Sequence, residues 1–203
     1  PRSTLFPYTT LFRSRTGLSA GVEIVAVGSR DSARAAEFAR AHGIGRAMSY
    51  DELLAAQDID AVYIPLPNSL HAPRSIEAMR AGKHVICEKP LALTEAEALE
   101  MYATADEAGV VLLEGYPYMF QPQTLQIERL IAEGAIGEVQ SMTAAFGFAL
   151  GNPADIRFDA ALGGGALLDV GCYPVSFIRQ IIGSRPTRVS AVARPVLDRK
   201  SVV

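Results

Sequence analysis

The sequence predicts an α/β fold in which a parallel sheet is followed by a partial α+β second domain. From Gly21 to Glu114, short and almost wholly apolar runs alternate with helical segments. That alternation is typical of a parallel sheet covered by helices on both faces. Beyond Glu114 the alternation stops, and helices are followed by one long stretch of strand character, which indicates a different second domain.

Four apolar runs rich in β-branched residues predict the strands of the first domain. These runs are 22–27, 60–65, 84–87 and 110–113. Helices are predicted between them at 32–42, 69–80 and 94–108, and a shorter helix is predicted to open after Ser49.

Local signals place the ends of these helices. Asp31 can cap the helix that follows it, and Gly43 can end that helix. The segments Ser49–Glu52 and Thr94–Glu97 both match the capping box, in which a hydroxyl and a glutamate satisfy the first free amides. Gly109 ends the helix that the second box opens.

The second half contains fewer elements. We predict a helix at 122–133, a long strand at 139–148, a loop at 152–158, an apolar helical stretch from the glycine run to Ile182, and a last strand at 187–196.

Composition limits the classes of function. The 203 residues carry a net charge of −3, and 20% of them are charged. This balance does not favour nucleic acid or a membrane surface as a partner, and no apolar run approaches the roughly 20 residues of a membrane helix. Cys87 and Cys172 lack metal-ligand spacing, so we expect two reduced thiols, no metal and a cytoplasmic protein.

Both ends look foreign to the rest. Residues 1–20 carry three arginines and no acid, and with residues 198–203 they resemble translated adapter sequence. The expected organisation is a foreign-looking segment at 1–20, an incomplete dinucleotide-binding domain at 21–116, a partial substrate and dimerisation domain at 117–197 and a foreign-looking tail at 198–203.

Polar residues follow the first predicted strand, 22–27. Right-handed crossovers bring the carboxyl ends of parallel strands to one edge, where ligands bind in such sheets. Ser29 and Arg30 occupy this tip, where an acid would accept a ribose hydroxyl and an arginine suits a 2′-phosphate. The tip therefore leans toward NADP, although a solvated surface arginine explains Arg30 about equally well.

The next strand ends in Pro65, Leu66 and Pro67, followed by Asn68 and His71. Asn68 can cap the following helix and leave its amides free for a phosphate group. An ordinary capped turn is the favoured explanation when this motif stands alone, and a lone histidine such as His71 is more often structural.

Glu88 and Lys89 follow the third strand and are the most informative pair. Two opposite charges directly after a buried strand cost free energy unless they are paired or used. A lysine at this edge can hydrogen-bond a reacting oxygen. The alternative is a salt bridge at the rim, and the two interpretations are about even.

Asp169 and Tyr173 interrupt an apolar stretch after the glycine run 163–165. Four residues apart, they share one face of a helix. The glycines allow a backbone to approach a ligand closely, and a tyrosine can donate a proton when a cation lowers its pKa from about 10. Considered alone, Tyr173 is better explained as a structural tyrosine with its ring in the core and its hydroxyl at the rim. Considered together with Asp169 and the glycine run, it is not.

Together these motifs resemble the Gfo/Idh/MocA oxidoreductases over roughly Gly21 to Val196. The resemblance rests on Pro67-Asn68 with His71, on Glu88-Lys89-Pro90, and on the glycine run with Asp169 and Tyr173. Many members have a histidine at Tyr173. The tyrosine form is similar to the dimeric dihydrodiol dehydrogenases and NADP-dependent D-xylose dehydrogenases.

The resemblance implies a hydride transfer between NADP, with NAD as the alternative, and a hydroxyl-bearing carbon of a sugar or dihydrodiol. The implied catalytic residues are Lys89, Tyr173 and Asp169. The implied cofactor-binding residues are Ser29, Arg30, Pro65, Leu66, Asn68, His71, Glu88 and Lys89. The implied substrate-binding residues are Arg157, Phe158 and Tyr118. The family also implies a homo-oligomer.

Two other functions remain open on this resemblance. One is a non-catalytic sugar-sensing relative, which retention of Lys89 and Tyr173 argues against; the other is an NAD-retaining lyase or epimerase of the same fold. The family begins with a strand and a Gly-x-Gly-x-x-Gly turn that binds pyrophosphate, and no such turn precedes Gly21. The expected first domain is therefore a truncated Rossmann-like sheet.

Overall fold

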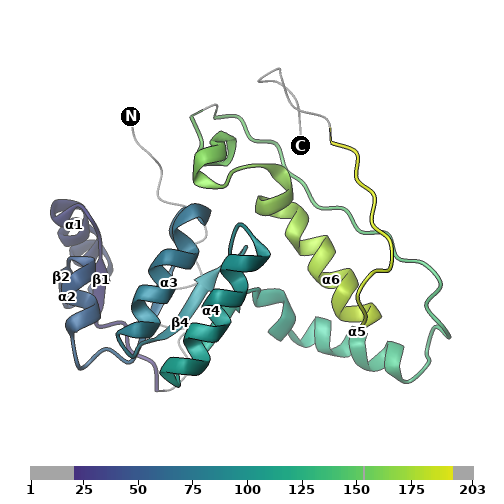
Figure 1. Ribbon diagram of the computed structural model, residues 1–203, viewed down its shortest axis with the longest axis horizontal. Helices are drawn as coiled ribbons and strands as arrows, with labels where there is room; N and C mark the ends of the chain where they lie inside the picture. Colours follow the sequence, from purple (N-terminus) through teal and green to yellow (C-terminus); the bar gives the residue numbers. More distant parts are fainter. Residues whose placement is uncertain (1–20, 153, 194–203) are drawn as a thin grey trace.

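The computed structural model describes residues 21–152 and 154–193. Its elements form three groups along the long axis of the molecule (Figure 1). The strands and helices of residues 26–55 lie at one end, and those of residues 61–115 lie in the middle. The helices at 122–132 and 172–182 lie at the other end. The foreign-looking segments predicted at both termini lie outside the described residues.

The first group is a parallel pair, β1 (Ala26–Gly28) and β2 (Arg46–Met48), with α1 (Ser32–His42) and α2 (Tyr50–Ala55). The predicted caps of α1 are confirmed, because the Asp31 carboxylate accepts from two amides and Gly43 adopts the left-handed conformation. The capping box that opens α2 is present as well.

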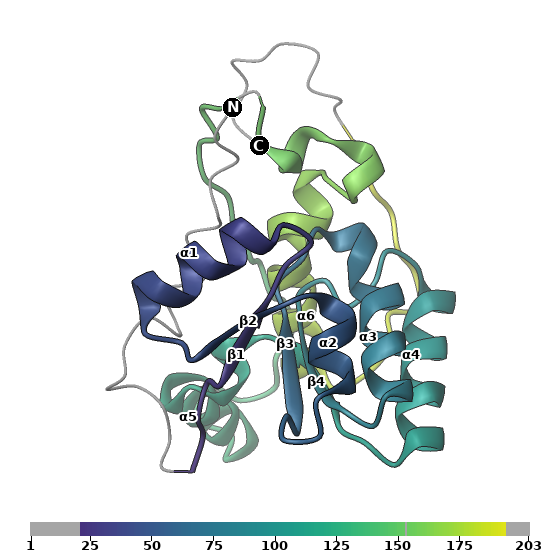
Figure 2. The same ribbon diagram turned by 90° about the vertical axis from the view of Figure 1, so that its left-hand side faces the viewer.

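The middle group is a parallel sheet in the order β3–β4–β5. Its strands are β3 (Ala61–Ile64), β4 (His84–Glu88) and β5 (Leu112–Gly115). The helices that follow β3 and β4 are α3 (His71–Arg80), preceded by the short turn η2 (Asn68–Leu70), and α4 (Glu95–Ala108). Figure 2 shows α3 and α4 side by side along this sheet.

The main core lies between this sheet and its two helices. Met79 of α3, Met101 of α4 and Cys87 of β4 are fully buried, and Val85 is 1% exposed. These four side chains come from three elements, α3, β4 and α4. Their burial fixes α3 and α4 on the sheet, and the sheet in turn places the ends of β3 and β4 side by side.

Two details of the predicted sheet are wrong. The described strands form two separate sheets, one of β1 and β2 and one of β3 to β5, where one sheet was expected. The strand expected at 22–27 begins only at Ala26, because its partner β2 is three residues long. That partner itself was not predicted, since Arg46–Met48 lacks an apolar run.

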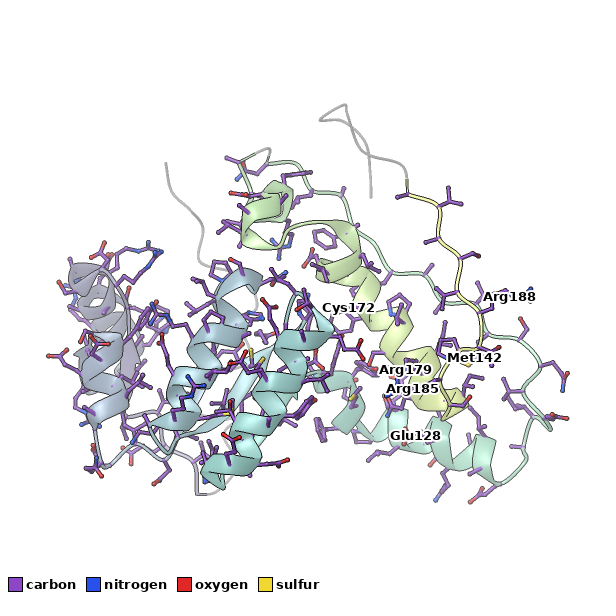
Figure 3. The ribbon with its side chains drawn as sticks, in the orientation of Figure 1. Glu128, Met142, Cys172, Arg179, Arg185 and Arg188 are labelled. Carbon is purple, nitrogen blue, oxygen red and sulfur yellow. The ribbon has the colours of Figure 1, made fainter. Side chains whose placement is uncertain are left out.

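The second half consists of helical pieces and extended chain. Its elements are η3 (Pro117–Phe120), α5 (Pro122–Ala132), η4 (Ile156–Phe158), η5 (Ala160–Leu162), the π-turn η6 (Leu167–Gly171) and α6 (Cys172–Ile182). Helix α6 meets α5 near Glu128 (Figure 3), where the Gln180 amide of α6 donates to the Glu128 carboxylate at 2.5 Å.

The strand predictions for this half are not confirmed. Residues 139–148 belong to no strand, and neither do residues 187–193. A strand exists only through hydrogen bonds to a neighbour, and neither segment pairs with another extended segment within the described residues. Residues 194–196 of the predicted last strand lie outside them.

One described stretch, Ala160–Ile182, is long and apolar enough to cross a membrane by length and composition alone. The expectation that no run approaches this length is thus corrected. Asp169 within the stretch is ion-paired with Lys89 and Arg157, so the stretch contributes to the site described next. Length and composition by themselves are weak evidence for a membrane span.

Candidate active site

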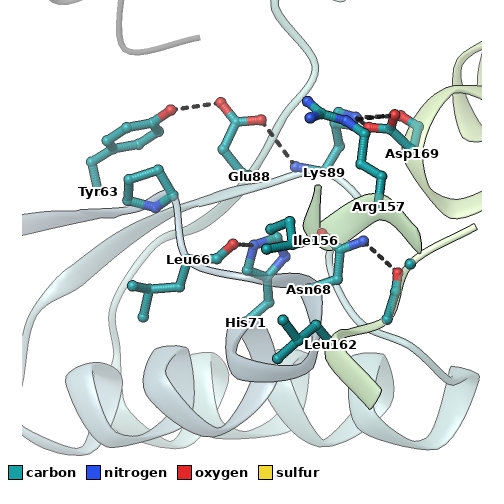
Figure 4. Close-up of a pocket in the computed structure, with 13 residues that line it drawn as sticks. Tyr63, Leu66, Asn68, His71, Glu88, Lys89, Ile156, Arg157, Leu162 and Asp169 are labelled. Carbon is teal, nitrogen blue, oxygen red and sulfur yellow. Dashed lines mark hydrogen bonds and ion pairs between the residues drawn. The ribbon is translucent and has the colours of Figure 1, made fainter. Parts of the chain in front are cut away.

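A cavity of about 100 Å³ lies where the ends of β3 and β4 meet the second half of the chain. Figure 4 shows the residues that line it: Tyr63, Pro65, Leu66, Asn68, His71, Glu88, Lys89, Ile156, Arg157, Leu162, Gly163, Gly164 and Asp169. Small-molecule sites usually enclose about 300–1,000 Å³, so this cavity matches one part of a dinucleotide or substrate.

Glu88 is held by a neighbouring strand residue that the sequence analysis missed. The Tyr63 hydroxyl donates to Glu88 Oε1 at 2.6 Å, and the other carboxylate oxygen accepts from the Lys89 amide at 3.3 Å (Figure 4). Burial raises the pKa of Tyr63 above its usual value, and the bond to Glu88 raises it further. Tyr63 therefore stays a neutral donor that orients the carboxylate toward the cavity.

Lys89 pairs with the second half of the chain rather than with Glu88. Its ammonium lies 3.3 Å from Asp169 Oδ1 and also donates to the Asp169 carbonyl oxygen. The side chains of Lys89 and Asp169 are only 9% and 16% exposed. The alternative interpretation, a salt bridge between Glu88 and Lys89 at the rim, is therefore wrong. Lys89 instead forms a partly buried ion pair with Asp169, which joins the two halves of the chain.

Tyr173 meets Lys89 from the first turn of α6. The Lys89 ammonium lies 5.2 Å from the centre of the Tyr173 ring, within the range of a cation–π contact. Asp169 lies one turn earlier, in η6. The structure therefore brings together the three residues predicted to be catalytic, although they are separated by up to 84 positions in the sequence.

A second cavity, of about 210 Å³, lies beside Tyr173. It is lined by Tyr118, Ala144, Ala145, Phe146, Tyr173, Pro174 and Phe177. The rings of Tyr116 and Phe146 both meet the Tyr173 ring edge to face, with centroids 5.3 Å apart. The Tyr118 hydroxyl donates to Ser176 at 2.9 Å. Tyr118, predicted to bind substrate, thus lies in an apolar cavity next to Tyr173.

His71 lines the first cavity as a buried side chain. Its side chain is 1% exposed, and its ring nitrogens lie 2.7 Å from the Pro90 carbonyl and 2.8 Å from the Leu66 carbonyl. Burial lowers the pKa of His71, and the two carbonyl contacts oppose that shift. Both ring nitrogens face backbone carbonyls, and a neutral imidazole carries one N–H, so His71 donates to one of the two. Since His71 lines the cavity, its contact with a cofactor stays a prediction.

Gly163 and Gly164 of the glycine run approach other protein segments closely and also line the first cavity, whereas a Cβ at Gly165 would meet nothing within 4 Å. A Cβ at Gly163 would lie 2.5 Å from the Leu93 side chain, and one at Gly164 would lie 2.5 Å from the Arg157 carbonyl oxygen. The Asn68 amide donates to the Gly163 carbonyl at 2.8 Å. Asn68, predicted to bind cofactor, therefore uses its side chain to hold this loop.

The remaining predicted residues lie apart from both cavities. Ser29 and Arg30 follow β1, where the Ser29 hydroxyl accepts from the Asp31 amide at 3.1 Å and Arg30 is exposed. Phe158 ends η4 and is 44% exposed. The structure thus separates the candidate adenosine end from the reactive centre and leaves Phe158 outside the lining of either cavity.

Several lining residues were missed because nothing in their local sequence marks them. Ile156 and Leu162 line the first cavity from a loop, and Phe146 lines the second from an extended segment. Tyr63 sits inside an apolar strand. Its alternation with buried Ile64 was the one available signal that its side chain faces away from the core.

Comparison with known families is consistent with this architecture. The model of an oxidoreductase family with an NAD-binding Rossmann fold matches residues 8–116, and the model of the GFO/IDH/MocA C-terminal domain matches residues 124–202. The chain belongs to the Gfo/Idh/MocA family of oxidoreductases.

Three relatives illustrate the similarity. An uncharacterized oxidoreductase of Rhizobium meliloti is 45% identical over 85% of the chain and 52% of its own length. The NADP(+) D-xylose 1-dehydrogenase 2 of Haloferax volcanii is 44% identical over 87% and 54%.

The 3-ketoreductase KijD10 of Actinomadura kijaniata was solved with NADP and TDP-benzene. It is 41% identical, with a TM-score of 0.74, over 79% of this chain and 49% of KijD10. The chain spans about half the length of the curated relatives it matches.

Proposed function

We propose that the protein carrying this chain transfers a hydride between NADP and a hydroxyl-bearing carbon of a sugar or dihydrodiol. The observation that carries the proposal is the position of the Lys89 ammonium, 5.2 Å from the centre of the Tyr173 ring and 3.3 Å from Asp169. An ammonium and a phenol from distant segments converge at the edge of a parallel sheet, where dinucleotide-binding folds place their ligands.

The residues present fit parts of a dinucleotide. The cavity beside Lys89 matches a single ring in size, and the Glu88 carboxylate, held by Tyr63, offers it an acceptor. At the tip of β1, the exposed Arg30 suits a 2′-phosphate. No Gly-x-Gly-x-x-Gly turn occurs within residues 21–152 and 154–193, so the fit concerns the nicotinamide and adenosine ends.

The chain's own residues supply the acid–base chemistry. When bound, NADP accepts or returns the hydride. Tyr173 removes the hydroxyl proton at its phenolic oxygen and returns it in the reverse direction. Lys89 orients the substrate oxygen and stabilises negative charge on that phenol, and Asp169 keeps the ammonium in place through the 3.3 Å pair.

Relatives support NADP and polyhydroxylated substrates. The Haloferax volcanii relative is named a D-xylose dehydrogenase using NADP(+), and KijD10 was solved with NADP. Trans-1,2-dihydrobenzene-1,2-diol dehydrogenase of Xenopus tropicalis is 38% identical over 83% of the chain and 52% of its own length. An apolar cavity beside Tyr173 suits the flat face of a sugar or diol ring.

The test is net formation of NADPH with a panel of aldoses and trans-dihydrodiols. Replacing Tyr173 by Phe should lower turnover by about 10²–10⁴-fold, the usual contribution of a general acid–base residue, with cofactor affinity retained. Turnover near the wild-type value in this variant would remove Tyr173 from the mechanism. Substrate conversion without net NADPH would instead support the lyase or epimerase alternative.

A further inference from the structure

We propose that Arg157 is a positioning residue, which fixes the Asp169 carboxylate and through it the Lys89 ammonium, rather than a residue that binds substrate. The proposal rests on the function proposed above and refines the expected role of Arg157. It follows from four side chains that form a chain of alternating charge beside the cavity, in the order Asp155, Arg157, Asp169 and Lys89.

The guanidinium of Arg157 is directed at two carboxylates. Its Nε donates to Asp169 Oδ2 at 2.8 Å, and its Nη1 lies 3.2 and 3.3 Å from the two oxygens of Asp155. The other Asp169 oxygen, Oδ1, lies 3.3 Å from the Lys89 ammonium. Asp169 is therefore clamped between two cations, one at each oxygen, and cannot rotate without losing one of them.

The environment makes this clamp strong. The side chains of the four residues are between 9% and 19% exposed, so water screens their charges weakly. Two cations and two anions alternate, which leaves no net charge to be solvated. The planar fork of arginine sets direction as well as distance, a property that a lysine lacks.

The backbone around Arg157 is anchored too. The Asp155 carboxylate accepts from the Arg157 amide at 3.0 Å, and the Arg157 carbonyl accepts from the Gly165 amide at 2.8 Å. The loop is thus folded on itself, and the guanidinium leaves it in a defined direction. Arg157 lines the first cavity, whereas Asp155 is not among the described residues that line it.

Because Arg157 lines the cavity and Asp155 does not, substitutions at the two positions separate substrate binding from positioning. The variants Arg157→Met, Arg157→Lys and Asp155→Asn are compared in the hydride-transfer assay, with Arg46→Met as the control. Arg46 also pairs with an aspartate, Asp58, at 2.8 Å, but that pair is exposed and remote from the cavity.

We expect turnover in Arg157→Met to fall by about 10²-fold, the effect of displacing a catalytic group by roughly 1 Å, with KM nearly unchanged. Arg157→Lys should recover part of the turnover. Asp155→Asn should lower turnover by a smaller factor, again at constant KM, while Arg46→Met stays at the wild-type value. A crystal structure of Arg157→Met should show the Lys89 ammonium displaced from the Tyr173 ring.

Other results would overturn the proposal. A raised KM at constant turnover in Arg157→Met would make Arg157 a substrate ligand, and unchanged turnover in both Arg157→Met and Asp155→Asn would remove its positioning role. If Arg157→Met fails to fold, Asp155→Asn decides, because it loosens the hold on the Arg157 guanidinium from a residue outside the cavity lining, and unchanged turnover in that variant would then overturn the proposal. Absence of net NADPH formation by the wild-type protein with every aldose and dihydrodiol of the panel would refute the proposed function instead, so the two failures are distinguishable.

Discussion

Buried polar side chains around the cavity are held by fixed partners, and this sets their protonation and direction. Tyr63 holds Glu88, and His71 joins the backbone of Leu66 to that of Pro90. Glu114 accepts from the Leu91 amide at 2.8 Å, and burial raises the pKa of that carboxyl. These side-chain contacts hold the two turns that follow β3 and β4 in place.

His71 should make the stability depend on pH near neutrality. Burial lowers its folded pKa below the unfolded value of about 6.5. Above that value neither state binds the proton, so the stability is complete. As the pH falls below about 6.5, the unfolded state takes up the proton more readily, and the free energy of unfolding decreases.

Urea unfolding between pH 5.5 and 7.5 tests this linkage. His71→Gln should lose about 1–3 kcal/mol at pH 7.5, because a buried carbonyl group loses the N–H that it accepts from, and it should lose much of the pH slope over this range. The control His42→Gln removes an exposed histidine and should keep the slope. An unchanged slope in His71→Gln would show that other groups cause it.

At the scale of elements, the loop from Asp155 to Gly165 decides how the two halves meet. The short turns η4 and η5 end on a glycine run that packs against Asn68 and Leu93. Gly163 has a φ of 77°, and the Gly164 amide donates to the Asp159 carbonyl at 2.9 Å. A side chain at Gly163 would clash with Leu93 and Asn68, and one at Gly164 would clash inside the loop with the carbonyls of Arg157 and Asp159.

Gly164→Ala should therefore destabilise the protein by about 1–3 kcal/mol, the usual cost of overpacking. Its new Cβ would lie 2.5 Å from the Arg157 carbonyl oxygen and 2.8 Å from that of Asp159. Gly151→Ala is the matched control, since a Cβ there meets nothing within 4 Å. Equal stability of the two variants in thermal unfolding would contradict the close approach seen at Gly164.

At the scale of the whole molecule, the two halves contribute different residues to the candidate site. The sheet half carries Lys89 and the candidate adenosine tip at Arg30, and the helical half carries Asp169 and Tyr173. Contacts between Asn68 and Gly163 and between Lys89 and Asp169 join them. A ligand bound across this junction should therefore stabilise both halves together.

We expect NADP to raise the melting temperature more than NAD does. A ligand present at 100 times its dissociation constant adds about 2.7 kcal/mol to the free energy of unfolding. Arg30→Glu should remove the preference for NADP, because a carboxylate repels the 2′-phosphate and accepts a ribose hydroxyl. Differential scanning fluorimetry with both nucleotides measures the effect, and a preference that survives in Arg30→Glu would place the phosphate elsewhere.

Local sequence was sufficient wherever the cause is local. The caps at Asp31, Ser49 and Thr94 were predicted correctly, because each acts on amides within three residues of itself. The position of Glu88 and Lys89 at the end of a buried strand was also predicted correctly, because the apolar run 84–87 marks that strand. The predicted strand at 139–148 was wrong, because alternation of side chains does not supply a partner.

The sequence by itself determined the helices, most of the strands and the residue types at the strand ends, because these depend on propensity, periodicity and contacts between near neighbours. Only the tertiary structure decided which of those residues meet. It paired Lys89 with Asp169 rather than Glu88, placed both nitrogens of His71 beside backbone carbonyls and turned Arg157 onto two aspartates. Such pairings depend on distances across the fold that no local pattern encodes, since they follow from how the core packs the two halves together.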